Sequence, residues 1–345
     1  MNVQLAHVRI TIGRLSVAFH RTLRIPDDGG HYPLPPSLGH FPVHRVEDYA
    51  ERVPESWRAH GGVFIPMYQR EAAWLSFSAP GWRPQALKVA VGMVNAVSGA
   101  PWSEAIVAGE EQDYLVCPPQ PWLDGINAGN GVIRQFVAMP LGMGYTVEGQ
   151  MTGDERFGGI QLVSFEAKAG RFPDTPPIPP SRLGREGAFA PCVSAFDLPS
   201  PASPLDGGEM GIAAGGRMEQ AIYPDPHGAD TWDNAKAGRV YVHIVNSMLY
   251  EQITGRKAPD TPVTARTYAE HGYPWFDLYD EHLGDVDPSE VLAGVKSIKE
   301  IDAAKGFKPQ QDDDPVDAPD HVVRKLHLAK PTKRKDIVAD GDWSR

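Results

Sequence analysis

The chain has 345 residues, which is too long for one small core and suits one large domain or two modest ones. Hydrophobic residues make up 41% of it and charged residues 22%, a balance typical of globular proteins and not of disordered chains. The formal net charge of −11 repels phosphate backbones, so we expect the body not to bind nucleic acid.

Glycine and proline are frequent, with 35 and 33 residues, which indicates many turns and excludes an all-helical bundle. No stretch approaches the roughly 20 apolar residues needed to span a bilayer. Residues 1–24 lack the continuous apolar run of a signal peptide. We therefore expect a cytoplasmic protein without membrane contact.

The sequence contains two cysteines, Cys117 and Cys192, which are too few for a disulfide framework or a structural zinc site. One bridge between them is possible in an oxidising compartment. For a cytoplasmic protein we expect two buried free thiols.

The first half of the chain is rich in short stretches with the character of β-strands. Residues 8–12 alternate between apolar and polar side chains, and residues 15–23 follow them after a Gly-containing turn. Further strands are predicted at 62–67, 72–77, 87–97, 132–139, 145–151 and 159–167, with a hairpin loop at 152–158. A helix interrupted by Pro54 is predicted at 46–57.

Small residues occupy one face of the predicted strand at 87–97, namely Ala90, Gly92 and Ala96. Such a face predicts that another element, for example a second sheet or another subunit, packs closely against it. Regularly spaced short strands with turn signals favour a sandwich or a barrel over βαβ units.

The second half is more mixed. A strand is predicted at 239–246, with Val240, Val242 and Ile244 on one face. Thr261-Pro262 predicts a helix start, and a second helix is predicted from Asp287 to Gly306. We therefore expect an α+β, β-rich fold, with an antiparallel sandwich or open-barrel N-terminal body and a smaller mixed α/β C-terminal half.

Composition divides the chain into four predicted segments. A β-rich domain covers 1–170, and a Pro-rich linker or docking arm covers 171–208. A mixed α+β region covers 209–306, and a charged tail that we expect to be disordered covers 307–345.

Two stretches contain side chains that could carry chemistry. An Asp-x-His pair on a Pro- and Gly-rich loop, with further carboxylates nearby, could hold a divalent metal ion. The candidate ligands are Asp225, His227, Asp230, Asp233 and His243. The alternative is an ordinary turn in which these carboxylates cap backbone amides.

The second stretch, at 271–282, places aromatic rings beside carboxylates, a composition found in pockets for sugars or aromatic ligands. The candidate pocket residues are Trp275, Tyr279, Asp280 and His282. The alternative is that the aromatic residues are core anchors and the polar ones face water.

Two hypotheses about function follow. The first is a soluble, non-catalytic binding or self-assembling protein, expected to form a homo-oligomer, with further protein contacts through the Pro-rich arm or the charged tail. The second is a metal-dependent hydrolase centred on the loop at 225–233. Because no nucleophile signature is present in the sequence, we favour the first.

Overall fold

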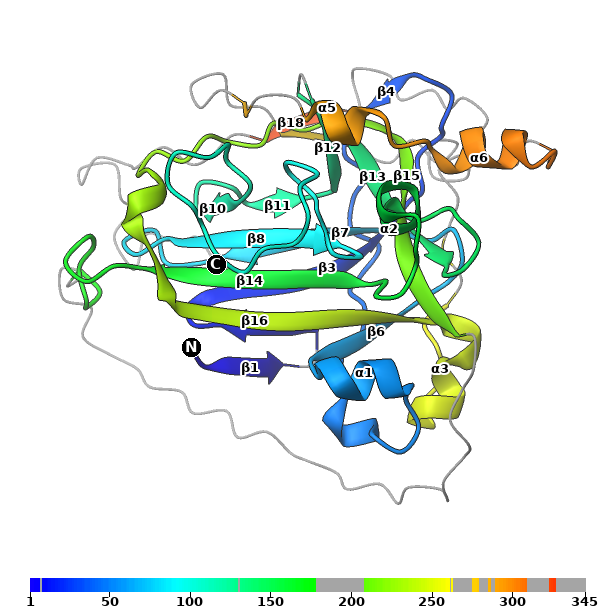
Figure 1. Ribbon diagram of the computed structural model, residues 1–345, viewed down its shortest axis with the longest axis horizontal. Helices are drawn as coiled ribbons and strands as arrows, with labels where there is room; N and C mark the ends of the chain where they lie inside the picture. The colour runs from blue at the N-terminus through cyan, green and yellow to red at the C-terminus, as the bar shows by residue number, and fades with distance from the viewer. Residues whose placement is uncertain are drawn as a thin grey trace, which may run out of the picture.

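A computed structural model describes residues 1–6, 8–129, 131–177, 208–260, 262, 275–278, 285–286, 289–308 and 323–326. The protein has an α+β, β-rich fold, which confirms the predicted class. Sixteen strands within the described residues form one sheet that is mostly antiparallel (Figure 1). None of the helices in this part of the chain has the length and apolar character needed to cross a lipid bilayer.

The N-terminal half supplies most of the strands. The predictions at 8–12, 15–23, 62–67, 72–77, 132–139 and 159–167 match strands, whereas the strands at 3–6, 31–32, 44–45, 115–117 and 122–129 were not predicted. The first strands are β1 (Val3–Ala6), β2 (Arg9–Ile12), β3 (Leu15–Thr22), β4 (His31–Tyr32), β5 (His44–Arg45), β6 (Val63–Met67) and β7 (Ala72–Ser78). They are followed by β8 (Gln85–Val91), β9 (Val94–Asn95), β10 (Leu115–Cys117), β11 (Trp122–Leu123), β12 (Gly125–Gly129), β13 (Val132–Pro140) and β14 (Ile160–Ala167).

Beyond the Pro-rich stretch, two long strands return to the same sheet. β15 (Glu209–Glu219) pairs with β13, and β16 (Trp232–Asn246) pairs with β14 in antiparallel register. The main strand order is β1-β2-β3-β7-β13-β15-β16-β14-β8-β10, with β6 pairing in parallel with the far end of β16. Strands before and after the Pro-rich stretch therefore share one sheet.

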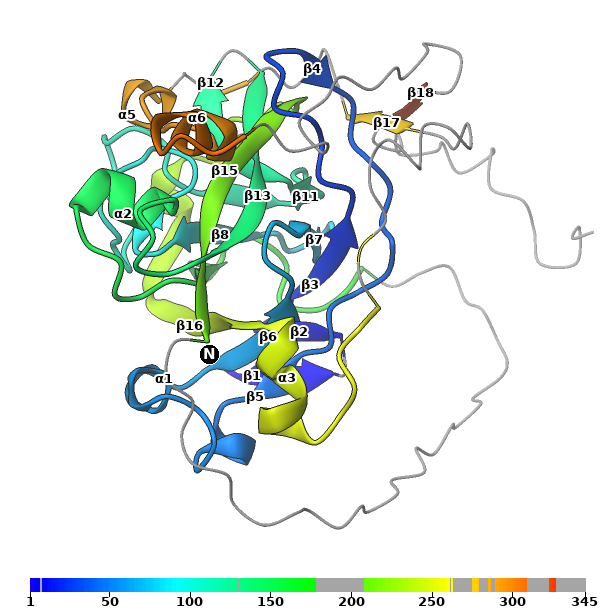
Figure 2. The same cartoon turned by 90° about the vertical axis from the view of Figure 1, so that its right-hand side faces the viewer.

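One core cluster draws side chains from across this sheet. It includes Val17 from β3, Leu75 from β7, Val89 from β8, Leu162 from β14 and Val242 from β16. Val240 and Ile244 lie in the same cluster, so the apolar face predicted for 239–246 is confirmed. Because all these residues pack together, the sheet bends around one common core (Figure 2).

The prediction of a strand at 145–151 is wrong, because these residues begin helix α2 (Val147–Thr152). The Thr146 side chain caps its first turn by accepting a hydrogen bond from the Gly149 amide, and Gly153 ends it with a φ of 76°. Residues 152–158 therefore connect a helix to β14 and are not a hairpin loop. Capping at both ends outweighs the strand-like composition.

The predicted strand at 87–97 is two strands, β8 and β9, because Gly92 and Met93 turn the chain between them with φ values of 54° and 65°. Of the small residues on this face, Gly92 lies close to α2. A Cβ placed on Gly92 would lie 2.4 Å from Cβ of Glu148.

Each predicted long helix is broken into two short ones. Residues 46–57 form the 3₁₀-helix η1 (Glu47–Tyr49) and α1 (Glu55–His60), which begins after Pro54. Residues 287–306 contain α5 (Glu290–Ala293), capped by Ser289, and α6 (Ile298–Ala304), which has a capping box of Ser297 and Glu300. The second cap starts a new helix, so the single helix predicted from Asp287 to Gly306 is two.

The remaining elements are the 3₁₀-helix η2 (Ala229–Thr231), the helix α3 (Ser247–Thr254), and β17 (Trp275–Leu278), which pairs in parallel with β18 (Val323–Leu326). β18 lies inside the segment that was predicted as a charged tail. The helix start predicted at Thr261 falls outside the described residues except for Pro262.

Candidate functional site

The Asp225 carboxylate holds the loop between β15 and β16 in place. Its Oδ2 accepts hydrogen bonds from the hydroxyl of Tyr114 at 2.7 Å and from Nε1 of Trp232 at 2.8 Å. Its Oδ1 accepts one from the amide of His227 at 2.7 Å. Burial, together with the bond to Asp225, raises the pKa of Tyr114. Asp225 thus anchors the loop to the sheet.

The other proposed metal ligands are spread out. The carboxylate of Asp233 accepts a hydrogen bond from the amide of Ala235, and the side chains of Asp230 and His227 are exposed. His243 lies eleven residues beyond Trp232 on β16, roughly 35 Å along an extended strand. Its Nε2 bonds to the carbonyl of Gly61 at 3.0 Å.

In the described ranges, no three His, Cys, Asp or Glu side chains are grouped so that they could hold a metal ion. His243 is not brought to the loop, since its ring stacks on Trp57 beneath α1 at 4.9 Å. A divalent cation bound by the remaining loop residues stays a prediction. Its test is the native mass of the purified protein, compared with that of the His227→Ala variant.

The aromatic stretch at 271–282 is described only at β17. Trp275 is paired with Val323 of β18. Tyr279, Asp280 and His282 lie outside the described residues, so the ligand pocket predicted there stays a prediction. Cys117 is a buried free thiol whose pKa is raised by burial, whereas Cys192 is outside the described residues.

One polar cluster was missed by the sequence analysis. The ring of His20 lies between two serines, with Nδ1 2.9 Å from Oγ of Ser37 and Nε2 2.7 Å from Oγ of Ser76. The hydroxyl of Ser37 donates to the carbonyl of Gly39, so its oxygen is free to accept from Nδ1. This pattern places the proton on Nδ1 and lets Ser76 donate to Nε2.

The ring of His20 also stacks on Trp74 at 3.7 Å, and burial lowers its pKa to about 4. At neutral pH it is therefore an uncharged link between β3 and β7. Ser76 is paired on both sides, with Ala18 of β3 and Trp122 of β11. No local sequence signal could reveal this cluster, because its members are separated by up to 56 residues.

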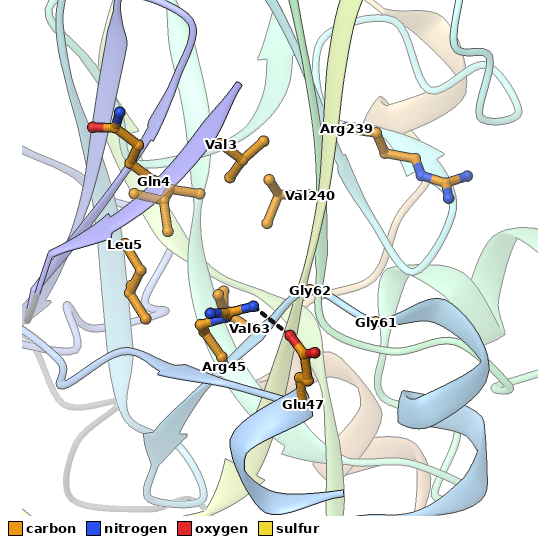
Figure 3. Close-up of a pocket in the computed structure, with 11 residues that line it drawn as sticks. Val3, Gln4, Leu5, Arg45, Glu47, Gly61, Gly62, Val63, Arg239 and Val240 are labelled. Atoms are coloured by element: carbon orange, nitrogen blue, oxygen red, sulfur yellow. Dashed lines mark hydrogen bonds and ion pairs between the residues drawn. The ribbon is translucent and has the colours of Figure 1, made fainter. Parts of the chain in front are cut away.

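A groove of about 720 Å³ lies where β1 approaches β16 (Figure 3). The apolar lining residues are Val3, Leu5, Ile10, Val63 and Val240, and the others are Gln4, Arg45, Glu47, Gly61, Gly62 and Arg239. In Figure 3 the side chains of Val3 and Val240 stand between the two strands. Val3 is 42% exposed although it is apolar, while Val240 is buried.

Two arginines border this groove. Arg45 forms an ion pair with Glu47, and both side chains are largely exposed. Arg239 pairs with Glu104 at 2.9 Å and lies over the ring of Tyr241 at 5.2 Å. Each of the two arginines beside the groove is thus paired with one carboxylate.

Among the described residues, no strand pairs with the edge of β1 that faces this groove. β1 is the last strand in the sheet order, and its register with β2 pairs Val3 with Ile12 and Leu5 with Ile10. The amide of Gly13 donates to the carbonyl of Asn2 at 2.9 Å. Because bonding alternates along antiparallel strands, the amides and carbonyls of Val3 and Leu5 point away from β2.

The sequence analysis did not predict β1, and no local pattern shows which strand lies at a sheet edge, because pairing is decided by distant residues. Comparisons with family models, with curated proteins and with solved structures gave no match to this chain.

Proposed function

We propose that this protein is a non-catalytic binding protein that assembles with copies of itself through the open edge of its sheet at β1. The observation that supports the proposal is the lack of protection on that edge. Sheet edges exposed to solvent normally carry charged residues, proline or a bulge that prevents pairing with another chain. The sequence Val-Gln-Leu-Ala of β1 contains no charge and no proline, and its pairing with β2 has no bulge.

The exposure of apolar side chains on β1 supports the same conclusion. Val3 and Leu5 share a face with Ile10 and Ile12, which are fully buried, yet Val3 is 42% exposed. Covering such a side chain stabilises an interface by roughly 25 cal/mol per Å² of apolar surface.

We also propose that the curved sheet is an open barrel, whose opening is the groove between β1 and β16. The Pro-rich arm at 171–208 and the charged segment at 307–345 are proposed as further contacts with a partner protein. Both lie largely outside the described residues.

The test is the native mass of the full chain and of the Val3→Lys variant, measured by native mass spectrometry and by light scattering. We expect a multiple of the chain mass for the wild-type protein. A lysine on the edge should shift the population toward monomer, because strand pairing would bury or crowd its charge. Val291→Lys is the matched control, since Val291 is 51% exposed on α5 at the opposite end of the molecule (Figure 1). A wild-type monomer at every concentration would refute the proposal.

A further inference from the structure

Two uncovered strand sides border the same groove. On one side are the outward amides and carbonyls of Val3 and Leu5 in β1. On the other is β16, which pairs with β14 from Trp232 to Val242 and with β6 only from Val242 onward. In the described part of the chain, the side of β16 opposite β14 therefore has no strand partner before Val242.

From this we infer that the groove accepts one extended peptide segment of a second copy, which adds to β1 as a strand. The inference rests on the proposed function and specifies how the copies join. A single extended segment in the groove would have β1 on one side and β16 on the other. Strand addition of this kind takes its affinity from main-chain hydrogen bonds and its specificity from alternate side chains.

The lining residues define which side chains such a segment would carry. Ile10, Val63 and Val240 are nearly or fully buried and form an apolar floor, and the partly exposed Val3 and Leu5 extend it. Since every second side chain of a strand faces the floor, these positions must be apolar.

Charge sets the second requirement. Arg45 and Arg239 border the groove, and each is paired with one carboxylate, Glu47 and Glu104 respectively. Arg45 has five donors and uses one of them on Glu47. A carboxylate beside the apolar residues of the bound segment would therefore be stabilised, whereas a lysine would be repelled.

This chemistry occurs in the chain itself. The sequence at 336–340 is Asp-Ile-Val-Ala-Asp, an apolar centre between two carboxylates, without proline. These residues lie outside the described part of the chain, and their sequence is the reason for choosing them. The heptapeptide Lys-Asp-Ile-Val-Ala-Asp-Gly, residues 335–341, is the probe.

The experiment adds this peptide to the full-length protein and follows both peptide binding and oligomer mass by native mass spectrometry. We expect one peptide per chain and a falling oligomer fraction, because the peptide competes with the segment of the second copy. Hydrogen exchange should show the amides of Val3 and Leu5 protected in the complex. The peptide with both aspartates replaced by lysine should bind at least tenfold more weakly.

Two protein variants locate the site. Arg45→Glu should weaken peptide binding at least tenfold. Arg58→Glu is the matched control, since Arg58 is exposed on α1 outside the groove, and should leave binding unchanged. A full chain carrying Asp336→Lys and Asp340→Lys should lose assembly.

Three outcomes separate the inference from the proposed function. Equal binding of the two peptides, or to Arg45→Glu and Arg58→Glu, would overturn the inference. An oligomer that dissociates with Val3→Lys but ignores the peptide and the aspartate changes would also overturn it, while leaving self-assembly through β1 intact. Peptide binding to a monomeric wild-type protein would support the groove as a strand site and refute self-assembly.

Discussion

The corner between α2 and β14 and the groove beside β1 differ in whether their backbone amides have hydrogen-bond partners within the protein. At the corner, the buried carboxylate of Glu148 accepts hydrogen bonds from three successive amides, those of Arg156, Phe157 and Gly158, at 2.8–2.9 Å. At the groove, the outward amides of Val3 and Leu5 have no strand beside them in the described residues. Buried polar groups require partners and exposed ones can use water, so the first region holds the fold and the second is free to bind.

The largest effect is expected at the corner. Glu148→Gln should lower the free energy of unfolding by about 2–4 kcal/mol, since it removes the charge that three amides share and turns an amide donor toward them. Urea unfolding followed by circular dichroism measures it. Glu110→Gln, at an exposed position, is the control and should change the value by less than about 0.5 kcal/mol. Equal values for the two variants would contradict the assigned role of Glu148.

Acidification should weaken the fold on the side of β16 that faces away from the core. Burial lowers the pKa of His243 from 6.5 to about 4, so between these values the unfolded chain binds a proton that the folded protein does not. The stabilisation is complete above pH 6.5 and is lost as pH falls toward 4, by at most about 3 kcal/mol. Melting temperatures from pH 8 to pH 4 should therefore fall less steeply in His243→Gln. Parallel curves would show that another group titrates.

A smaller effect, this time a gain in stability, is expected on replacing Asp124. Only one of the two oxygens of this buried carboxyl has a hydrogen-bond partner. Its Oδ2 accepts from Nε1 of Trp122, while Oδ1 is buried without a hydrogen-bond partner. Burial raises the pKa of this carboxyl well above 3.8, so its contribution to stability is present at low pH and declines as pH rises through the folded-state pKa. Asp124→Asn should stabilise the protein by about 1 kcal/mol at pH 8 and by less at pH 4. Unfolding curves at the two pH values would decide; a loss of stability at pH 8 would mean that the carboxylate is charged and paired.

The smallest effect on stability is expected at the groove. Val3→Lys should change the free energy of unfolding of the monomer by less than about 0.5 kcal/mol. Val3 is 42% exposed, so the ammonium group of the lysine can reach water. Denaturant unfolding at low protein concentration tests this. A loss of 2 kcal/mol or more would show that Val3 belongs to the core and would remove the contrast between the two regions.

Local sequence patterns predicted the strands well where the pattern is strong. Period-two alternation located β2 and the second half of β16, and the helix start predicted at Asp287 lies close to α5, which Ser289 caps. Local sequence patterns failed where two short-range signals favour different structures. Residues 145–151 have the composition of a strand, but Thr146 and Gly153 cap a helix there. At 87–97 two consecutive residues with positive φ divide one apolar run into a hairpin.

The sequence by itself determined the β-rich class, the positions of the strands with clear alternation and the net negative charge. It could not show that β15 and β16 join the sheet of the first half, nor that His243 packs under Trp57, roughly 35 Å along β16 from the loop it was expected to join. Only the tertiary structure decided which strand edge lacks a partner in the described part of the chain, and which carboxylates already accept hydrogen bonds from the protein. The physical reason is that alternation fixes which face of a strand is buried, whereas pairing and hydrogen-bond partners are set by residues far away in the chain.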